Sequence, residues 1–203
     1  MKKTFLLVVA CVFTFIGAQA QSSEVEAVNQ LTKAEQFKEK NNFIKETLIY
    51  KYATGATELN PNGLVISVIL LTDLKSGEQV AVFEFGCEIY SKSIFNNPYS
   101  FIGYLDIDQV DDLILALETI SNEFENSDPK DKCTISYTTS DGIDIFSTRT
   151  NVTFRKKWLV TNEYGTQSYK YGDSVAIIRN KNIEKVISSI KEAQMIAKQS
   201  LRQ

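Results

Sequence analysis

Five positively charged side chains lie close together in the last third of the sequence, and aromatic residues alternate with them. Cations beside aromatic rings can hold anionic ligands, because the cations pair with phosphate or carboxylate groups while the rings stack on bases or sugars. The same residues on an edge strand can instead protect a sheet against aggregation, which is a structural role. The sequence therefore predicts a surface for a polyanion or anionic glycan, formed by Arg149, Arg155, Lys156, Lys157, Trp158 and Lys170.

Four aspartates within seven positions form the densest acidic cluster of the chain. Their spacing does not match the calcium loop of an EF-hand, because Val110 and Asp111 stand where that loop has a ligand and a glycine. Carboxylates at this point can still bind a hard cation or serve as an acid and base pair. They can equally stabilise the start of a helix, with Asp108 as its N-cap. Cation binding stays an open question for Asp106, Asp108, Asp111 and Asp112.

The chain of 203 residues contains no histidine. This excludes Ser-His-Asp triads, Cys-His dyads, and zinc or haem sites with histidine ligands. The sequence also lacks a glycine-rich phosphate loop, a CxxC pair and a nucleophile elbow. We therefore predict no catalytic residue, no metal ligand and no cofactor, and we favour a binding module over an enzyme. The alternative is an exported hydrolase that uses carboxylates such as Asp106 and Asp108.

The first twenty residues have the pattern of a secretory signal peptide. Two lysines precede an almost wholly apolar run over residues 5–17, and Ala18-Gln19-Ala20 fits a signal peptidase site. This run is shorter than a membrane-spanning helix, and no later stretch approaches the required length of about 18 residues. We expect cleavage after Ala20 and export to the periplasm or the exterior of a bacterial cell. The alternative is a lipoprotein anchored at Cys11, because Val8-Val9-Ala10-Cys11 resembles a lipobox.

Cleavage leaves two cysteines, Cys87 and Cys133, which are 46 positions apart. An oxidising compartment permits a disulfide between them. Such a bond would stabilise the fold by roughly 3–4 kcal/mol, if it acts by restricting the unfolded chain. Both residues can instead be small buried hydrophobes. The sequence leaves these two alternatives open.

Hydrophobic periodicity divides the mature chain into one helix and two similar blocks. Residues 21 to about 42 are polar, with an apolar residue every third position, which predicts a helix. Four runs with strand composition then precede an amphipathic helix, and the same order follows again. The expected strands are 45–54, 64–71, 79–89, 100–106, 132–139, 143–149, 152–161 and 167–178, and the expected helices carry apolar stripes over 110–124 and 183–197.

The two predicted helices align at an offset of 73 positions, so that Val110 corresponds to Ile183 and Leu117 to Ile190. Each helix directly follows four strands. We therefore predict an α+β fold with two ββββα repeats about a pseudo-twofold axis, in which each antiparallel sheet is covered by one helix. The expected boundaries are 1–20 for the signal peptide, 21–43 for the N-terminal segment, 44–126 for the first repeat and 127–203 for the second, with the repeats forming one compact unit.

This element order resembles the repeat architecture of the Whirly and PUR-alpha proteins. The resemblance covers residues 45 to about 200 and rests on the order of elements, without matching signature residues. It implies a sheet surface that binds single-stranded nucleic acid. Because no nucleotide-contacting residue of either family has a counterpart here, the resemblance supplies a fold and no site. Export argues against nucleic acid as the ligand.

The net charge of −3 divides unevenly along the chain. The first twenty residues carry +2, residues 21–130 carry −10, and residues 131–203 carry +5. Halves of opposite charge can dock on each other or on a second copy, so we expect a monomer or a homodimer. The basic half can also face an anionic partner. The sequence thus predicts an exported, non-enzymatic interaction module for an anionic glycan or a protein, with a Whirly-like nucleic-acid binder as a further alternative.

Overall fold

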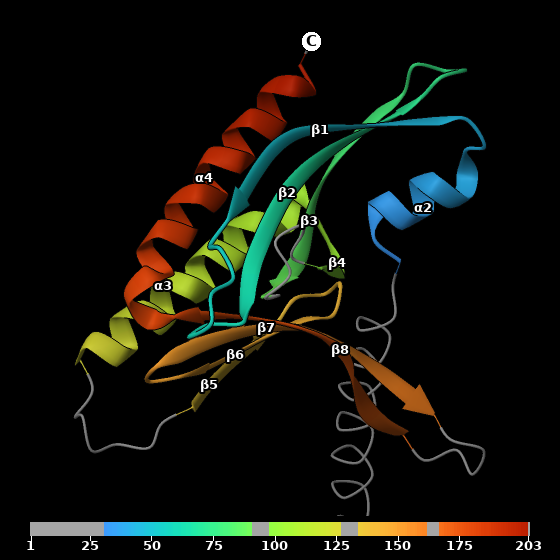
Figure 1. Cartoon of the computed structure of the whole chain (residues 1–203). Helices are drawn as coiled ribbons and strands as arrows, with labels where there is room; N and C mark the ends of the chain where they lie inside the picture. The colour runs from blue at the N-terminus through green and yellow to red at the C-terminus, as the bar shows by residue number, and fades with distance from the viewer. Residues whose placement is uncertain (1–30, 91–97, 127–133, 162–166, 203) are drawn as a thin grey trace, which may run out of the picture.

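The computed structural model describes residues 31–90, 98–126, 134–161 and 167–202. These residues form two four-stranded antiparallel sheets, each followed by a long helix, and a short helix that precedes the first sheet (Figure 1). The predicted α+β fold with two ββββα repeats is confirmed. The predicted signal peptide, the lipobox at Cys11 and the cysteine at position 133 lie outside the described residues.

The first sheet contains β1 (Ile44–Ala53), β2 (Asn62–Asp73), β3 (Gln79–Ile89) and β4 (Tyr99–Asp106), in that order. Apolar residues cover both faces of β3, because this strand lies inside the sheet with its neighbours on both sides. Phe83 and Phe85 point to one face, which meets the second sheet, and Val82 points to the other, which meets the N-terminal helix. The observed bounds lie within two residues of the expected ones.

The second sheet contains β5 (Thr134–Thr138), β6 (Ile143–Thr148), β7 (Asn151–Thr161) and β8 (Gln167–Arg179), again in chain order. The turn between β5 and β6 contains Gly142, whose φ of 78° favours glycine. A side chain at Gly142 would also collide with the carbonyl oxygen of Lys157. This glycine therefore fixes the hairpin that the sequence predicts.

A short 3₁₀ turn connects each sheet to its helix. The turn Ile107–Gln109 leads into α3 (Val110–Asn126), and the turn Asn180–Asn182 leads into α4 (Ile183–Ser200). The first junction and the second lie 73 positions apart in the sequence, as the alignment of the helices predicts. The helical path begins earlier than expected, and Asp106, not Asp108, occupies the N-cap position of the first turn. Asp108 lies inside the turn and pairs with Lys33 instead.

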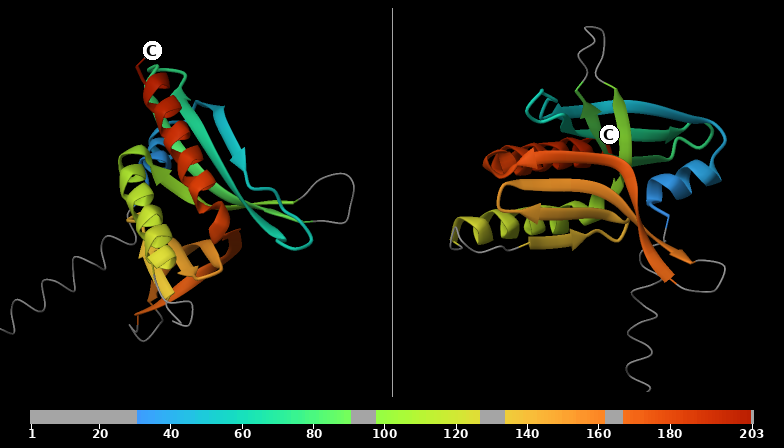
Figure 2. Two further views of the ribbon diagram at one scale, coloured as in Figure 1. Left: turned by 90° about the vertical axis from the view of Figure 1, so that its left-hand side faces the viewer. Right: turned by 60° about the horizontal axis from the view of Figure 1, so that its bottom comes forward.

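The two repeats share one hydrophobic core. Its buried members come from both sheets and both long helices, and they include Phe85, Leu117, Phe154 and Ile190. Helix α4, which follows the second sheet, packs on β1, β2 and β3 of the first, while α3 lies beside β5 of the second (Figure 2). The helices are thus exchanged between the repeats, so that neither half buries its apolar surface without the other.

Contacts between equivalent residues mark a pseudo-twofold axis. Glu118 and Lys191 are 73 positions apart, and the Lys191 Nζ donates to the Glu118 carboxylate at 2.7 Å. Two hydrogen bonds on either side of this pair are also equivalent under the same offset, from Ser121 to Glu184 at 3.0 Å and from Gln194 to Asp111 at 3.0 Å. Helices α3 and α4 therefore run antiparallel and contact each other through matching positions.

The axis continues into the core at two phenylalanines. Phe85 lies opposite Gly103 in the first sheet, and Phe154 lies opposite Ala176 in the second. Because Gly103 and Ala176 are 73 positions apart, Phe85 and Phe154 are equivalent residues. Their rings stack with centroids 6.2 Å apart and planes inclined by 8°. Each repeat thus supplies the same residue to the centre of the interface.

Helix α2 (Lys33–Lys40) covers part of the outer face of the first sheet. Thr32 and Glu35 form a capping box at its start, and the Asp106 carboxylate accepts the backbone N–H of Lys33 at 3.0 Å. Ala34 and Phe37 are buried against the sheet. This part of the predicted N-terminal helix is confirmed, while residues 21–30 are outside the described chain. No helix of the described residues is long and apolar enough to span a membrane.

Candidate functional site

The predicted cationic site divides between several places in the structure. Arg155 and Lys157 both project from the face of the second sheet that points away from the first. Arg155 lies over the ring of Tyr171, with its guanidinium carbon 3.7 Å from the ring centroid, and Lys157 lies over Tyr169 at 4.3 Å. These two cations and their two tyrosines form one continuous surface, which we call the cation–tyrosine ladder.

The other four predicted residues lie elsewhere. Lys156 points toward the first sheet, where its ammonium group donates to the backbone carbonyl of Asp141. Lys170 alternates with the two tyrosines along β8 and therefore projects from the opposite face of the strand. Arg149 lies in the turn between β6 and β7, beside the end of α3. The backbone of Trp158 pairs with Lys170, and its side chain is outside what the structure describes.

Three of the four aspartates in the acidic cluster make contacts that connect elements of the fold. Asp106 binds the start of α2, Asp108 pairs with Lys33, and Asp111 accepts a hydrogen bond from Gln194. In the described parts of the chain, no group of three or more acidic or cysteine side chains is arranged to hold a metal ion. Asp112 differs from the other three, because it makes neither a hydrogen bond nor an ion pair to a described residue, and it lines a pocket.

Two buried carboxylates meet where the repeats and α2 join. The backbone N–H of Asp106 donates to the Asp141 carboxylate at 3.2 Å, and Gln109 donates to the same carboxylate at 3.2 Å. Burial raises the pKa of both carboxyls. The two donors just named oppose the shift at Asp141, and the backbone N–H of Lys33 opposes it at Asp106. Because both groups already accept hydrogen bonds from the fold, they stabilise the junction of β4, the β5–β6 turn and α2.

Cys87 lies in β3 and is buried among core residues. Burial raises the pKa of its thiol, so the reactive thiolate is disfavoured. The disulfide between Cys87 and Cys133 stays a prediction, because the second cysteine belongs to the residues that the structure does not describe.

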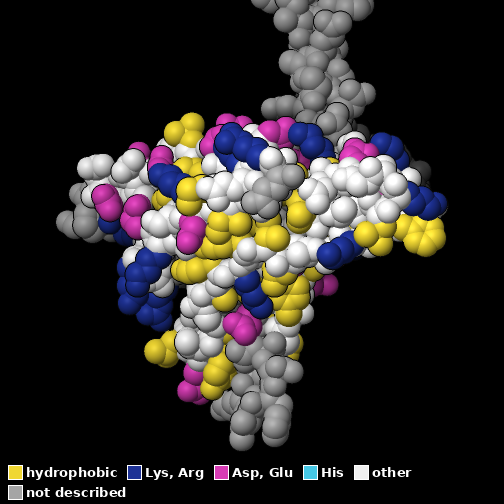
Figure 3. All heavy atoms as spheres, turned by 90° about the horizontal axis from the view of Figure 1, so that it is seen from above, with side chains coloured by type: hydrophobic (Ala, Val, Ile, Leu, Met, Phe, Trp, Pro, Cys, Tyr) yellow, Lys and Arg dark blue, Asp and Glu magenta, His cyan; other side chains and the backbone are white. Residues whose placement is uncertain are grey.

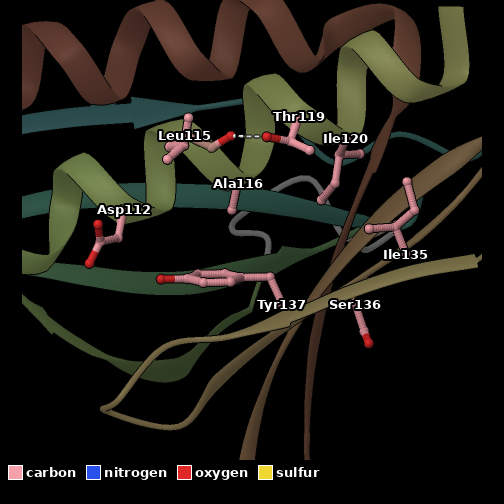
Figure 4. A pocket seen from close by; sticks show the side chains of 8 residues that line it. All are labelled: Asp112, Leu115, Ala116, Thr119, Ile120, Ile135, Ser136 and Tyr137. Atoms are coloured by element: carbon pink, nitrogen blue, oxygen red, sulfur yellow. Dashed lines mark hydrogen bonds between the residues drawn. The ribbon is translucent and has the colours of Figure 1, made fainter. Parts of the chain in front are cut away.

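A pocket of about 380 Å³ lies between α3 and β5, at a place that the sequence did not indicate (Figure 4). Its wall is mainly apolar, and Leu115 at its rim is 62% exposed. Figure 4 shows Tyr137 and Ile135 on the side of β5 that faces α3, and Ser136 directed away from the helix. The lining residues are Asp112, Leu115, Ala116, Thr119, Ile120, Ile135, Ser136 and Tyr137.

The pocket reaches the open edge of the second sheet. Three consecutive residues of β5, Ile135, Ser136 and Tyr137, line the pocket, although consecutive side chains of a strand point to opposite faces. The pocket therefore borders the backbone of β5 as well as side chains on one of its faces. Among the described residues, β5 pairs only with β6, and it ends the sheet. On its other side, the backbone of residues 135–137 has no strand partner among the described residues and lies beside an apolar hollow.

Asp112 gives this pocket a polar end. Its carboxylate lies near the hydroxyl of Tyr137 in Figure 4. Burial of the phenol raises the pKa of Tyr137, and the negative charge of Asp112 adds to the shift. Thr119 donates its hydroxyl hydrogen to the backbone carbonyl of Leu115 at 2.8 Å, so this hydroxyl can only accept a hydrogen bond from a ligand. The pocket therefore combines an apolar body with one negative charge.

The other pockets and surfaces are weaker candidates for a binding site than the α3–β5 pocket and the cation–tyrosine ladder. A pocket of about 550 Å³ beside α2 contains Glu35 and Lys156, but the capping box and the Asp141 carbonyl already engage these groups. A pocket of about 240 Å³ contains Arg149 and Glu125. Figure 3 shows exposed apolar side chains between charges of both signs on the face seen from above, without a patch of one sign.

No protein-family model, curated protein or solved structure matches the chain. The resemblance to the Whirly and PUR-alpha architecture accordingly stays a prediction from the order of elements. The geometry of the α3–β5 pocket and of the cation–tyrosine ladder is the basis for the proposals below.

Proposed function

We propose that this protein is an exported, non-enzymatic binding module that takes an extended peptide segment of a partner protein. The segment pairs with the outer edge of β5 along residues 135–137 and inserts an apolar side chain into the pocket beside α3. One observation carries this proposal, namely that the pocket is lined by three consecutive residues of an edge strand, Ile135, Ser136 and Tyr137. An added strand uses backbone hydrogen bonds for affinity and side-chain pockets for specificity.

The size of the pocket supports a peptide side chain as its occupant. A volume of about 380 Å³ accepts a large aliphatic or aromatic side chain, and Ala116 keeps the floor open between the larger Leu115 and Ile120. Burial of such a side chain contributes about 1.5–3 kcal/mol. The carboxylate of Asp112 has no ion-pair partner among the described residues and lies at one end of the pocket, so it favours a lysine or arginine next to the apolar residue.

The test begins with a phage-displayed library of random dodecapeptides selected on the chain from residue 21 to 203. We expect enriched peptides to alternate apolar and polar residues and to contain a basic residue. Synthetic copies should bind in calorimetry, and hydrogen exchange should slow at amides of β5 on binding. Selection without enrichment, or protection confined to other strands, would contradict the proposal.

Two matched variants distinguish the groove from general hydrophobic binding. Leu115 and Met195 are both exposed apolar residues of long helices, at 62% and 53%, but only Leu115 lines the pocket. Leu115→Ser should weaken peptide binding by about tenfold, which corresponds to ~1.4 kcal/mol, while Met195→Ser should leave it unchanged. Equal losses in both variants would show that the groove is not the site.

A further inference from the structure

The cation–tyrosine ladder consists of Arg155, Lys157, Tyr169 and Tyr171 on the outer face of the second sheet. Arg155 and Lys157 are two positions apart on β7, as Tyr169 and Tyr171 are on β8, and the pairing of these strands shifts register between the two cations. The rings are 54% exposed at Tyr169 and 41% exposed at Tyr171. The ladder therefore presents a row of charge and ring surface to solvent.

Arg155 is held in one orientation by three groups. Its Nε donates to the buried Asp144 carboxylate at 2.9 Å, and its guanidinium stacks over Tyr171 and lies 5.8 Å from the Phe146 ring centroid. Thr138 donates to the other oxygen of Asp144 at 2.9 Å and fixes the carboxylate. An arginine fixed in this way loses little conformational entropy when it binds an anion.

Donors remain available after these contacts. Arg155 uses only its Nε in hydrogen bonds to the described residues, which leaves the N–H groups of both Nη atoms. Lys157 makes a ring contact but has no ion pair or hydrogen bond to a described residue. Two oriented cations with unused donors are suited to a row of carboxylates or sulfates.

We propose that the cation–tyrosine ladder binds an acidic polysaccharide, independently of the α3–β5 pocket. Sugar carboxylates would accept hydrogen bonds from Arg155 and Lys157. The exposed parts of Tyr169 and Tyr171 would contact the sugar rings. Nucleic acid fits this surface less well, because base stacking needs open ring faces and a cation already covers one face of each tyrosine. The same protein would then connect a peptide partner to an anionic glycan.

The experiment uses fluorescent tetragalacturonate as the anionic probe, with maltotetraose as the neutral control and a ten-nucleotide single-stranded DNA as the competing polyanion. At low salt we expect the acidic sugar to bind, its affinity to fall with added salt, and maltotetraose not to bind. No binding of tetragalacturonate at low salt would overturn the proposal, as would tighter binding of the DNA.

Matched charge variants locate the site. Lys157→Gln should weaken tetragalacturonate binding by about tenfold through loss of one charge-assisted contact. Lys170→Gln removes the same charge from the opposite face of the same ribbon and should change binding less than about twofold. Arg155→Lys keeps the charge but not the fork of donors, and should also weaken binding. Equal losses at Lys157 and Lys170 would show attraction by net charge alone and overturn the assignment.

The sugar site and the peptide groove can fail separately. Leu115→Ser should leave tetragalacturonate binding unchanged, because Leu115 lies at the β5 side of the sheet and the ladder lies on β7 and β8. A loss of sugar binding in this variant would contradict a separate site.

Discussion

The two halves of the molecule contain the same groove between a long helix and an edge strand, but only one of these grooves is filled. In the first half, Tyr50 of β1 reaches across to α4 and donates its hydroxyl hydrogen to Glu192 at 3.1 Å. Under the repeat offset, the position of Glu192 corresponds to Thr119 of α3, which bonds to its own helix instead. The short side chain of Thr119 does not reach across the second groove as Glu192 reaches toward Tyr50 in the first, and a pocket lies there.

This difference shows how a duplicated fold can separate stability from binding. The interface about the axis keeps matching contacts in both halves, such as Ser121–Glu184 and Gln194–Asp111. The grooves lie at the outer edges of the sheets, where a change in one half does not require a change in the other. One edge therefore supports the fold, and the other is available to a partner.

The largest expected effect is a loss of stability from substitutions in the core that the two halves share. Phe85→Ala and Phe154→Ala should each destabilise the protein by about 3–5 kcal/mol, because both rings are fully buried at the axis. Urea unfolding monitored by circular dichroism measures both variants. Similar losses would confirm that the two residues contribute equally to the core, whereas a small loss at only one site would show that the core depends mainly on the other repeat.

The turn carboxylates of the two halves should respond oppositely to pH. Burial raises the pKa of Asp141, so its stabilising contribution is complete below its ordinary pKa of 3.8 and is lost as pH rises through the raised value. The hydroxyl of Ser76 lowers the pKa of Asp73, whose contribution is present above 3.8 and is lost as pH falls through the lowered value.

Urea unfolding of Asp141→Asn and Asp73→Asn across this pH range separates the two directions. The free energy of unfolding of Asp141→Asn should increase relative to that of the unmodified protein as pH rises above 3.8. For Asp73→Asn, the same difference should increase as pH falls below 3.8. If both variants change in the same direction, the difference between the turns is not real.

A smaller effect is expected at the helix pair on the axis. Glu118→Lys places like charges together and should cost about 0.5–1 kcal/mol, because both partners are partly exposed to water. Addition of Lys191→Glu restores an ion pair in the reverse order and should recover most of this loss. A double variant that is less stable than Glu118→Lys would show that other charges, not this pair, determine the contact.

The smallest effect separates the filled groove from the open one. Tyr50→Phe removes the bond to Glu192 and should cost about 0.5–1 kcal/mol. Tyr137→Phe removes a hydroxyl that makes no hydrogen bond to the described residues, and should cost less than about 0.5 kcal/mol. Equal losses would indicate that Tyr137 has a protein partner and that its groove is not open to a ligand.

Local sequence patterns predicted the elements well, because turn residues and apolar periodicity are local properties. The offset between Val110 and Ile183 also predicted the junctions of both helices with their sheets. The exchange of helices was not predictable in this way, since stripes on α3 and α4 fit either sheet. Only the backbone arrangement decides which sheet each helix covers.

The candidate sites show the same division. Alternation along a strand separates Lys156 from Arg155 and Lys157, but the stacking of Arg155 on Tyr171 depends on the pairing of two strands. The α3–β5 pocket left no mark in the sequence, because Ala116 and Ile135 are ordinary residues whose importance comes from an unfilled space between them. No sequence motif indicates where side chains will leave a space unfilled.

The ion pair of Glu118 and Lys191 has a consequence for assembly. A residue on a true twofold axis meets its own copy, so a homodimer built from first repeats would oppose two glutamates, and one from second repeats would oppose two lysines. Only the pairing of a first repeat with a second repeat places opposite charges there. The ion pair therefore disfavours the association of two identical repeats and favours the pairing of the two different repeats within one polypeptide.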